Sequence, residues 1–568
     1  MGDRSLRGLR RRLVLTYEYL GWRTLLWRVL TFPLRFTPLR LPLGLGPPAE
    51  QHVFDAQRWA RRHAPPLHTV VPGAPLTAPA GHDLLVLGPG LEPRPGAVAV
   101  LQHAAHVAPG AAVAAPIVLA GGTIESAGLC RDASDPNGLV RRFAGRPAGH
   151  GPAAVAGPVL AAAPDCALVT AAAVEGGAAT PTDASLAAWT AGHEVLAVPA
   201  AVVERRGGAP AAPEAPPDLA ARLDARPVRT ADGRLRVVYV TQETTVGGGH
   251  RDVFEHLNRL AARGHDVALY TLGAQPDWFG LDIAVTTFAG WDALTAALAD
   301  LDAIKIATWW KSALPVWRAT RRHGLPVYFV QDIETSYYPG DEAGQSEVLA
   351  SYRSEFAYAT ISGWNRDRLA ELGVAAQIVA PGIDLRTFRP LGARRRDDML
   401  LAVGRSHHLK NLDLTLDAWK GLDAPRPELC LFGVEPELGP RHGARYVTAP
   451  SDEEVNALLN EATVFLQTSR HEGFALPPLE AMATGAAVVC TDAHGNRDFC
   501  RDGVNCLMPD ADAASVRGAI ARLLADPALR RRLGEAGIRT AADYAWERRI
   551  DALEAVLERV AATGRSSA

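Results

Sequence analysis

Two glutamates, Glu472 and Glu480, stand in the segment HEGFALPPLEAMATGAAVV, residues 471–489, with a double proline between them. The segment follows the predicted strand TVFLQTS. Pro477 and Pro478 suit the first turn of a helix, where a missing backbone N–H is tolerated. The pattern therefore predicts a strand, a loop and a helix N-terminus, whose free N–H groups and dipole can hold an anion.

Two cations stand upstream of this segment, in GRSHHLKNL. Arg405 and Lys410 come just after another predicted strand, MLLAVGR. Because the carboxyl ends of parallel strands meet at one edge of a sheet, both side chains can converge on the same anion. A guanidinium fork, an ammonium and a helix N-terminus can together hold a diphosphate without a metal ion. The sequence therefore predicts a diphosphate site that needs no cofactor.

The elements that position these residues alternate between strand and helix. From residue 235, LRVVYVT, the glycine loop TTVGGGH, DVFEHLNRLAARG and HDVALYTL predict a strand, a loop, a helix and a strand. A second such series starts near Met399, and in it Ser451 and Glu454 can form a capping box. This order predicts an α/β fold with two Rossmann-like domains that face a cleft.

The whole chain has 568 residues and a net charge of −3. Its length suggests roughly three or four domains, and its charge argues against a general attraction to nucleic acid. No run of about 18 apolar residues predicts a membrane span. Residues 1–45 mix arginine with aromatic residues, which is typical of a helix in a membrane interface or of one packed on its own protein. We therefore expect a cytoplasmic protein, with peripheral contact to the inner membrane face as an alternative.

The six cysteines do not form any C-x-x-C pair, and most lie in apolar runs. This favours reduced, buried thiols in a cytosolic protein over a disulfide framework or a zinc site. The six are Cys130, Cys166, Cys430, Cys490, Cys500 and Cys506.

Changes in composition divide the chain. The part before residue 235 contains a region of short apolar runs, which predicts a small α/β domain, and a stretch rich in proline and alanine, which predicts a linker. The predicted divisions are a basic amphipathic segment (1–45), the small α/β domain (50–205), the linker (206–234), two Rossmann-like domains (235–385 and 386–545) and a C-terminal helix and tail (546–568).

VGRSHHLKN together with SRHEGFALPPLEAMATGAAVV resembles the C-terminal domain of glycosyltransferase family 4, whose members are retaining sugar-nucleotide enzymes with the GT-B fold. The two glutamates match the E-x7-E motif of that family. APGIDLRTFRP, residues 380–390, is similar to the segment between its two domains. The resemblance covers roughly residues 235–560.

The resemblance implies a role for each matching residue. Glu480 would bind the ribose hydroxyls of the nucleotide, and Glu472 would lie beside the transferred sugar. Arg405 and Lys410 would neutralise the diphosphate as it leaves. Glu472 could act as a covalent nucleophile, or the acceptor could attack from the front face with help from the leaving phosphate. We favour front-face attack.

Backbone groups complete the implied nucleotide-sugar site. The amides of Phe474, Ala475 and Leu476 would contact phosphate or sugar. Gly248 and Gly249, in the glycine loop of the first Rossmann-like domain, would let the backbone approach the phosphates from across the cleft.

The stretch PVYFVQDIETSYYPGDE, residues 326–342, contains Gln331 and Asp332, which either contact the acceptor or lie in a solvated loop. With ATWWKSA, it is similar to bacterial rhamnosyltransferases of family 4. That resemblance implies dTDP-L-rhamnose as the donor. Trp309 and Trp310 either stack on a sugar face or belong to the core.

Residues 83–204 resemble pieces of a family 2 glycosyltransferase with the GT-A fold. That family places an aspartate after its central strand to hold a metal-bound diphosphate, where this chain has Leu87, Gly88, Pro89 and Gly90. We therefore expect a reduced, degenerate GT-A-like domain without catalysis.

The expected function is a retaining hexosyltransferase of cell-envelope polysaccharide biosynthesis. It would move a sugar, with L-rhamnose as the specific prediction, from a nucleotide diphosphate to a hydroxyl of a growing cell-surface glycan. The expected partners are the nucleotide-sugar donor and a free or lipid-linked glycan acceptor, and residues 1–45 could touch a membrane. The alternatives are a glycan-binding scaffold without turnover and a glycoside phosphorylase on the same fold.

Overall fold

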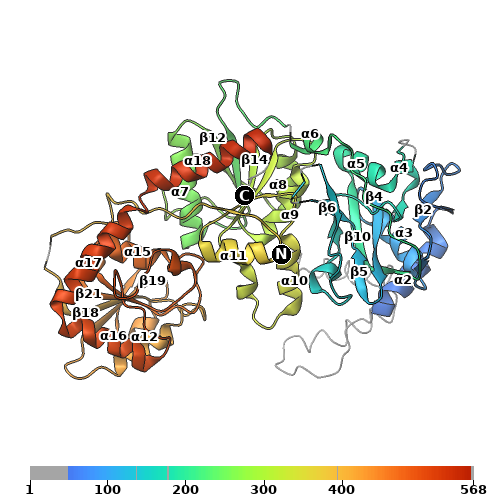
Figure 1. Ribbon diagram of the computed structural model, residues 1–568. Coiled ribbons are helices and arrows are strands. Elements are labelled where there is room, and N and C mark those ends of the chain that lie inside the picture. Colours follow the sequence, from blue (N-terminus) through green and yellow to red (C-terminus); the bar gives the residue numbers. More distant parts are fainter. Residues whose placement is uncertain are drawn as a thin grey trace, which may run out of the picture. The chain divides into compact units, whose positions relative to one another are not determined.

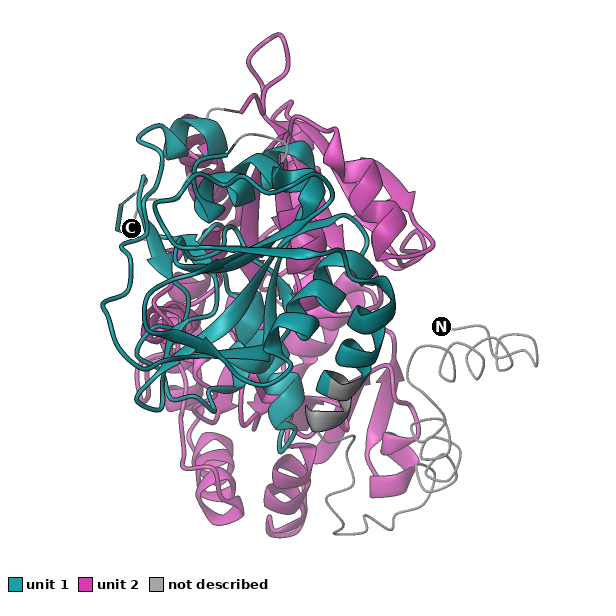
Figure 2. Cartoon of the chain, turned by 90° about the vertical axis from the view of Figure 1, so that its right-hand side faces the viewer, with its two compact units in different colours: residues 1–223, 338–355 teal, residues 224–337, 356–568 magenta. Residues whose placement is uncertain are grey.

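The computed structural model describes residues 49–564, apart from residues 133, 136, 175–177, 225 and 393. The basic segment predicted at residues 1–45 lies outside this part of the chain. The chain forms two compact units (Figure 2): unit 1 contains residues up to 223 and residues 338–355, and unit 2 contains residues 224–337 and 356–568. Among the described helices, none is long and apolar enough to cross a bilayer.

Unit 1 is an α/β domain built on a mixed sheet of eight strands (Figure 1). Leu84 and Val86 pack into one apolar cluster and Leu85 into another, so neighbouring residues of one strand bury the two faces of the sheet. The strands run in the order β1 (Leu67–Val70), β2 (Asp83–Leu87), β9 (Cys166–Val169), β4 (Ala111–Ala120), β10 (Glu194–Arg205) and β3 (Leu91–Pro93), with β5 (Thr123–Ser126) beside β4 and β8 (Gly157–Pro158) beside β10.

The other elements among the described residues of unit 1 are a two-stranded ribbon and several helices. They are β6 (Leu129–Arg131), β7 (Leu139–Arg141), α2 (Ala49–His63), α3 (Ala97–Val107), η2 (Gly151–Ala154), α4 (Ala171–Val174), α5 (Pro181–Ala191) and α6 (Leu219–Asp224). One helix comes from much later in the sequence: α10 (Glu342–Ser351) packs on η2. Just after α10, Arg353 donates a hydrogen bond from Nη1 to the Pro158 carbonyl at 2.8 Å. The chain thus leaves unit 2 for unit 1 and returns.

The N-terminal half of unit 2 has a parallel sheet of seven strands. Their order is β13 (Ala284–Thr287), β12 (Asp266–Thr271), β11 (Arg236–Thr241), β14 (Ile304–Ala307), β15 (Leu325–Val330), β16 (Ala357–Thr360) and β17 (Gln377–Ile378). The helical elements between them are α7 (Gly248–Ala262), α8 (Trp291–Ala299), α9 (Trp310–Ala319), η3 (Glu334–Tyr337) and α11 (Gly363–Glu371). Strand followed by crossover helix is the pattern predicted from residue 235 onward.

The C-terminal half has a second parallel sheet, of five strands. Met399 and Leu401 face one apolar cluster, and Leu400 and Ala402 face the other. The order is β20 (Arg445–Thr448), β19 (Glu428–Gly433), β18 (Arg396–Val403), β21 (Ala462–Gln467) and β22 (Ala487–Cys490). Its helical elements are α12 (Leu412–Lys420), α13 (Leu438–His442), α14 (Asp452–Glu461), α15 (Leu476–Ala483), η4 (Gly495–Asp498) and α16 (Ala513–Ala525).

Local signals in the sequence fix two helix starts in this half. Ser451 and Glu454 form the predicted capping box at the start of α14. The segment with the two prolines begins α15 at Leu476, so Pro477 and Pro478 lie in its first turn. Both results follow from the N–H groups that a helix start leaves without intrahelical partners.

The last helices of the chain connect the two halves of unit 2. After α17 (Pro527–Ala542), the chain crosses back, and α18 (Trp546–Thr563) packs against α7 of the N-terminal half (Figure 1). His265 Nε2 lies 2.9 Å from Glu554 Oε1 along this contact. Gly382 permits the crossing, because a Cβ at this position would lie 2.4 Å from Trp546 Cδ2.

Candidate active site

A cleft of about 740 Å³ lies between the two parallel sheets of unit 2. Its walls are the loops that follow the carboxyl ends of the strands, which is where doubly wound sheets bind ligands. All of the predicted site residues line it: Gly248, Gly249, Gln331 and Asp332 from the N-terminal half, and Arg405, Lys410, Glu472, Phe474, Ala475, Leu476 and Glu480 from the C-terminal half. The structure therefore brings the predicted set together in one place.

Glu472 and Lys410 form an ion pair on the cleft wall. Lys410 Nζ lies 2.8 Å from Glu472 Oε1 and 2.7 Å from Oε2. Gln467 Nε2 and Ser469 Oγ also donate to Oε1, at 3.0 and 2.7 Å. The Glu472 side chain is 11% exposed, whereas that of Lys410 is 36% exposed. The carboxylate is held in place, and the ammonium keeps contact with the cleft.

Arg405 is the second cation of the same wall. It lies two residues after the end of β18, and its Nε lies 3.5 Å from Glu435 Oε1. About a third of its side chain is exposed. Lys410 follows five residues later, in a turn whose backbone is closed by a bond from Lys410 N to the His407 carbonyl at 2.8 Å. The loop after one strand thus supplies both positive charges, as predicted.

The loop before α15 lines the cleft. Ala475 precedes the helix with a φ of 79°, a left-handed conformation that strains a residue with a Cβ, and no side chain caps the helix. Pro477 and Pro478 have no N–H, so the donors left at this end are the amides of the preceding loop and of Leu476. Gly473 is needed for close packing, since a Cβ there would lie 2.2 Å from the Gln331 carbonyl oxygen.

Glu480 faces the cleft from α15 and has an unusual pKa. Desolvation raises the pKa of this carboxyl to about 7, although the nearby Arg251 guanidinium acts in the opposite direction. Arg251, in α7, pairs with Asp452 of α14 through Nη2 and Oδ1 at 2.6 Å. A hydroxyl-rich ligand at Glu480 would therefore meet a carboxylate that is easily protonated near neutral pH.

Gly248 and Gly249, the two predicted residues of the glycine loop, both line the cleft but differ in the space around them. A Cβ on Gly249 would lie 2.6 Å from Gln331 Oε1, so the end of that side chain would have to move to admit it. A Cβ on Gly248 would meet nothing within 4 Å. Both residues begin α7, whose N-cap position, Gly247, offers no side-chain cap. The start of this helix lines the same cleft as Lys410 and Glu472, and its first N–H groups have no partner within the helix.

Asp332 is engaged by a histidine that the sequence analysis did not assign. His471 Nε2 lies 2.6 Å from Asp332 Oδ1, and His471 Nδ1 lies 2.9 Å from His494 Nδ1. Trp364 of α11 stacks on His494, with ring centroids 4.9 Å apart and planes at 19°. His471 lies in the quoted segment, immediately before Glu472, but its partners are 139 and 23 residues away. The sequence offered no sign of these contacts.

The two tryptophans of ATWWKSA have different surroundings. Trp309 lines the cleft, and its ring centroid is 5.7 Å from that of Tyr337. Trp310 is not part of the cleft wall; Lys311 Nζ lies 5.2 Å from the centroid of its ring. Of the two, Trp309 is the one that a sugar in the cleft could stack on.

The sequence of the C-terminal half matches a known family. Residues 385–540 match the family described as Glycosyl transferases group 1. A D-inositol 3-phosphate glycosyltransferase of Frankia alni is 30% identical over 246 residues, which are 37% of this chain and 59% of that protein. An MMP alpha-(1->4)-mannosyltransferase of Mycolicibacterium hassiacum is 31% identical over 198 residues, which are 32% of this chain and 48% of that protein. The chain spans about half the length of the curated relatives it matches.

A solved structure shares the fold of unit 2. The sucrose-phosphate synthase of Thermosynechococcus elongatus superposes with a TM-score of 0.50 at 18% identity, over 58% of this chain and 100% of that structure. The predicted GT-B fold, with two Rossmann-like domains and a cleft, is confirmed. The family match confirms the prediction of a glycosyltransferase domain in the C-terminal half. The resemblance to rhamnosyltransferases and the GT-A-like character of unit 1 stay predictions.

Proposed function

We propose that this protein is a retaining glycosyltransferase, which moves a sugar from a nucleotide diphosphate to a hydroxyl of a growing cell-surface glycan. One observation carries the proposal: Arg405 and the Lys410–Glu472 pair line the same cleft as the N-terminus of α15. This set of groups places positive charge and N–H donors where a diphosphate leaves, and a carboxylate where a sugar becomes positively charged.

The proposed reaction breaks the bond between the anomeric carbon and the diphosphate oxygen, and forms a bond from that carbon to the acceptor oxygen. Negative charge grows on the diphosphate, where Arg405, Lys410 and the loop amides stabilise it. The departing phosphate oxygen takes the proton of the acceptor hydroxyl on the same face of the sugar. This front-face course retains the anomeric configuration without a covalent intermediate.

The contacts of Glu472 favour this course over a covalent glycosyl-enzyme. Its Oε1 already accepts from Lys410, Gln467 and Ser469, and its Oε2 is bound by Lys410. A carboxylate with its lone pairs occupied is a weak nucleophile but a stable negative charge. We therefore assign Glu472 to the stabilisation of the positive sugar and to the positioning of Lys410.

Glu480 takes the ribose in this proposal. Glu480 lies in the first turns of α15, whose N-terminal N–H groups are proposed to bind the diphosphate. Because the ribose site and the diphosphate site share this helix end, one nucleotide can reach both. Ribose hydroxyls donate hydrogen bonds to a carboxylate, and desolvation makes each of these bonds stronger.

L-rhamnose from dTDP-L-rhamnose is our specific proposal for the donor, and it rests on residues 326–342 and ATWWKSA. A thermal-shift panel of dTDP-, UDP- and GDP-sugars tests it, because a ligand at 100 times its dissociation constant adds about 2.7 kcal/mol of stability. The largest shift should come from dTDP-L-rhamnose. If only UDP- or GDP-sugars raised the unfolding temperature, dTDP-L-rhamnose would be ruled out as the donor.

Turnover separates the proposed activity from its alternatives. With donor and acceptor glycan, we expect release of free nucleoside diphosphate and, by NMR, an anomeric configuration equal to that of the donor. Donor binding without release would indicate a glycan-binding scaffold. A requirement for inorganic phosphate would indicate a glycoside phosphorylase.

We propose further that unit 1 is a degenerate, non-catalytic domain of GT-A type. Its support is the pairing of its buried acids: Asp165 accepts from Arg141 Nη2 at 2.9 Å and from Arg205 Nη2 at 2.7 Å. Arg205 also holds Glu125, with Nη2 and Oε1 2.8 Å apart. Carboxylates neutralised in this way are poor ligands for the metal ion of a GT-A site.

A further inference from the structure

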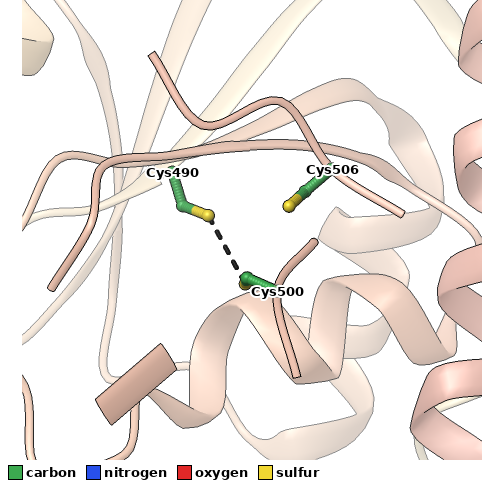
Figure 3. Close-up of side chains that lie close together, drawn as sticks. All are labelled: Cys490, Cys500 and Cys506. Carbon is green, nitrogen blue, oxygen red and sulfur yellow. Dashed lines mark hydrogen bonds between the residues drawn. The ribbon is translucent and has the colours of Figure 1, made fainter. Parts of the chain in front are cut away.

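Three of the six cysteines lie together in the core of the C-terminal half of unit 2. The Sγ atoms of Cys490, Cys500 and Cys506 all lie within 4.8 Å of one another (Figure 3). The Sγ atoms of Cys490 and Cys500 lie 3.5 Å apart. The three residues are 1%, 3% and 0% exposed. Figure 3 shows the side chains of Cys490 and Cys506 pointing toward one another, with Cys500 beside them.

The fold fixes the backbone of each cysteine. Cys490 ends β22, and its N–H donates to the Leu507 carbonyl at 3.0 Å. Cys500 follows η4, and its N–H donates to the Asn496 carbonyl at 2.8 Å. The Cys506 carbonyl accepts from Gly503 N at 2.9 Å, in a turn that brings the chain back to Cys500. The three thiols are therefore positioned before any ligand arrives.

The distances fit a shared ligand. A metal–thiolate bond of about 2.3 Å places sulfur atoms roughly 3.8 to 4.0 Å apart around a tetrahedral or trigonal ion. The Cys490–Cys500 distance of 3.5 Å and the upper bound of 4.8 Å for all three pairs bracket this value, whereas a disulfide requires about 2.05 Å. In the part of the chain that the structure describes, no histidine, aspartate, glutamate or further cysteine joins the group. Three sulfur ligands in an apolar core suit a soft cation that accepts few ligands.

We propose that Cys490, Cys500 and Cys506 form a binding site for a thiophilic metal ion of the Cu(I) or Zn(II) class. Binding converts the thiols to thiolates and releases their protons to solvent. The spacing of these cysteines along the chain predicted no zinc site, because it matches no short metal motif. The site forms only when β22, η4 and the turn before Leu507 come together.

The bound ion would stabilise the support of the candidate active site. Between Cys490 and Cys500, the Ala493 carbonyl accepts from Glu472 N at 3.0 Å, and Phe499 packs on Phe474 with ring centroids 5.2 Å apart. An ion that joins the two ends of this segment fixes the surface against which the Glu472 loop rests. The site is independent of the donor, so its test does not depend on the proposed transfer activity.

The experiment uses the full chain, reduced and freed of metal by a chelator. Zn(II), Cd(II) and Cu(I) are added in turn, in competition with a chromophoric chelator, and bound metal is counted per chain. We expect one tightly bound ion, with charge-transfer absorption typical of thiolates. X-ray absorption at the metal edge should show three sulfur neighbours. Binding of either Zn(II) or Cu(I) supports the site, and the tighter of the two identifies the ion.

Variants assign the binding to these residues. Cys500→Ala and Cys506→Ala should each weaken binding by more than about 100-fold, since even the loss of an outer-shell partner costs 10- to 100-fold. Cys430→Ala removes a buried cysteine of the same half that lies outside the group and should bind like the wild type. The proposal is overturned if the wild type binds no ion, if its ion has fewer than three sulfur neighbours, or if the folded variants bind as tightly as Cys430→Ala. The X-ray absorption result decides the matter even if the variants do not fold.

Discussion

The two units of this protein use their carboxylates in different ways. In unit 1, Asp165 is 2% exposed and is bound by two arginines whose side chains are 9% and 6% exposed. In unit 2, Glu472 is bound by Lys410, which keeps 36% of its side chain exposed on the wall of a cleft. A pair enclosed on all sides can only hold the fold together. A pair on a cleft wall can share its cation with an arriving anion.

The same contrast extends to other carboxylates. Asp83 of unit 1 is buried, and its Oδ2 lies 2.8 Å from His106 Nε2 and 3.2 Å from Gln102 Nε2. Glu480 of unit 2 lines the cleft, and its pKa is raised. Within the part of the chain that the structure describes, its carboxylate accepts no hydrogen bond. Asp83 is satisfied by its own unit, whereas Glu480 is left ready for a ligand in the cleft. This difference is the physical basis for placing the chemistry in unit 2.

The largest effect should come from breaking the buried network of unit 1. Arg205→Ala leaves Asp165 and Glu125 with less positive charge and should lower the free energy of unfolding of unit 1 by about 3–5 kcal/mol. Chemical denaturation followed by circular dichroism measures it. Arg206→Ala, at a neighbouring side chain that is 65% exposed, should cost less than about 1 kcal/mol. Equal losses in the two variants would contradict the structural role assigned to this network.

Removal of the Lys410 ammonium should lower turnover rather than destabilise the fold. Lys410→Ala should lower kcat/KM about 10²- to 10³-fold, because a donor to the developing negative charge is lost. Lys420→Ala removes an exposed lysine at the end of α12 and should leave kcat/KM unchanged. Full activity of folded Lys410→Ala would remove Lys410 from the mechanism.

A smaller effect is expected at the glycine loop. Gly249→Ala places a methyl group against the end of the Gln331 side chain, which must shift, and should lower the free energy of unfolding by about 1 kcal/mol. Gly248→Ala, at the neighbouring position, meets open space and should change stability by less than about 0.5 kcal/mol. Thermal unfolding and donor titration of both variants measure the difference in stability and in donor affinity between them. If Gly248→Ala were the more harmful, close approach would not explain the glycine at 249.

The smallest predicted effect concerns pH. Glu480 has its pKa raised from an ordinary 4.5 to about 7 in the folded protein. Between these values the folded state keeps a proton that the unfolded state has lost, so this group's contribution to stability falls as pH rises from 4.5 to 7. Glu480→Gln should therefore be more stable than the wild type at pH 8, and equally stable near pH 4.

The same variant should bind the donor nucleotide more weakly at pH 8, because a neutral amide replaces the carboxylate. In the wild type, donor affinity should decrease as the pH falls below about 7, where the carboxyl is protonated. Denaturation curves at pH 4 and pH 8 and donor titrations over the same range measure both effects. A stability difference that does not change with pH would contradict the raised pKa.

Much of the fold and of the cleft wall could be predicted from the sequence, because their signals are local. Arg405, Lys410 and Glu472 lie within a few residues of a strand end, and parallel strands bring such ends together. The Asp332–His471 contact could not be predicted, since it joins residues 139 positions apart. The packing of α10 in unit 1 and the meeting of three cysteines likewise depend on tertiary contacts that no spacing rule describes.

The central claim is that Arg405 and Lys410 hold a diphosphate in the cleft of unit 2. Calorimetric titration of the nucleoside diphosphate of the best donor, in chelator-containing buffer, tests it most directly. Arg405→Ala and Lys410→Ala should each weaken binding by about 10- to 100-fold, as the loss of a charge-assisted hydrogen bond does, while Lys420→Ala should bind like the wild type. Unchanged affinity in both folded cleft variants would show that the diphosphate binds elsewhere.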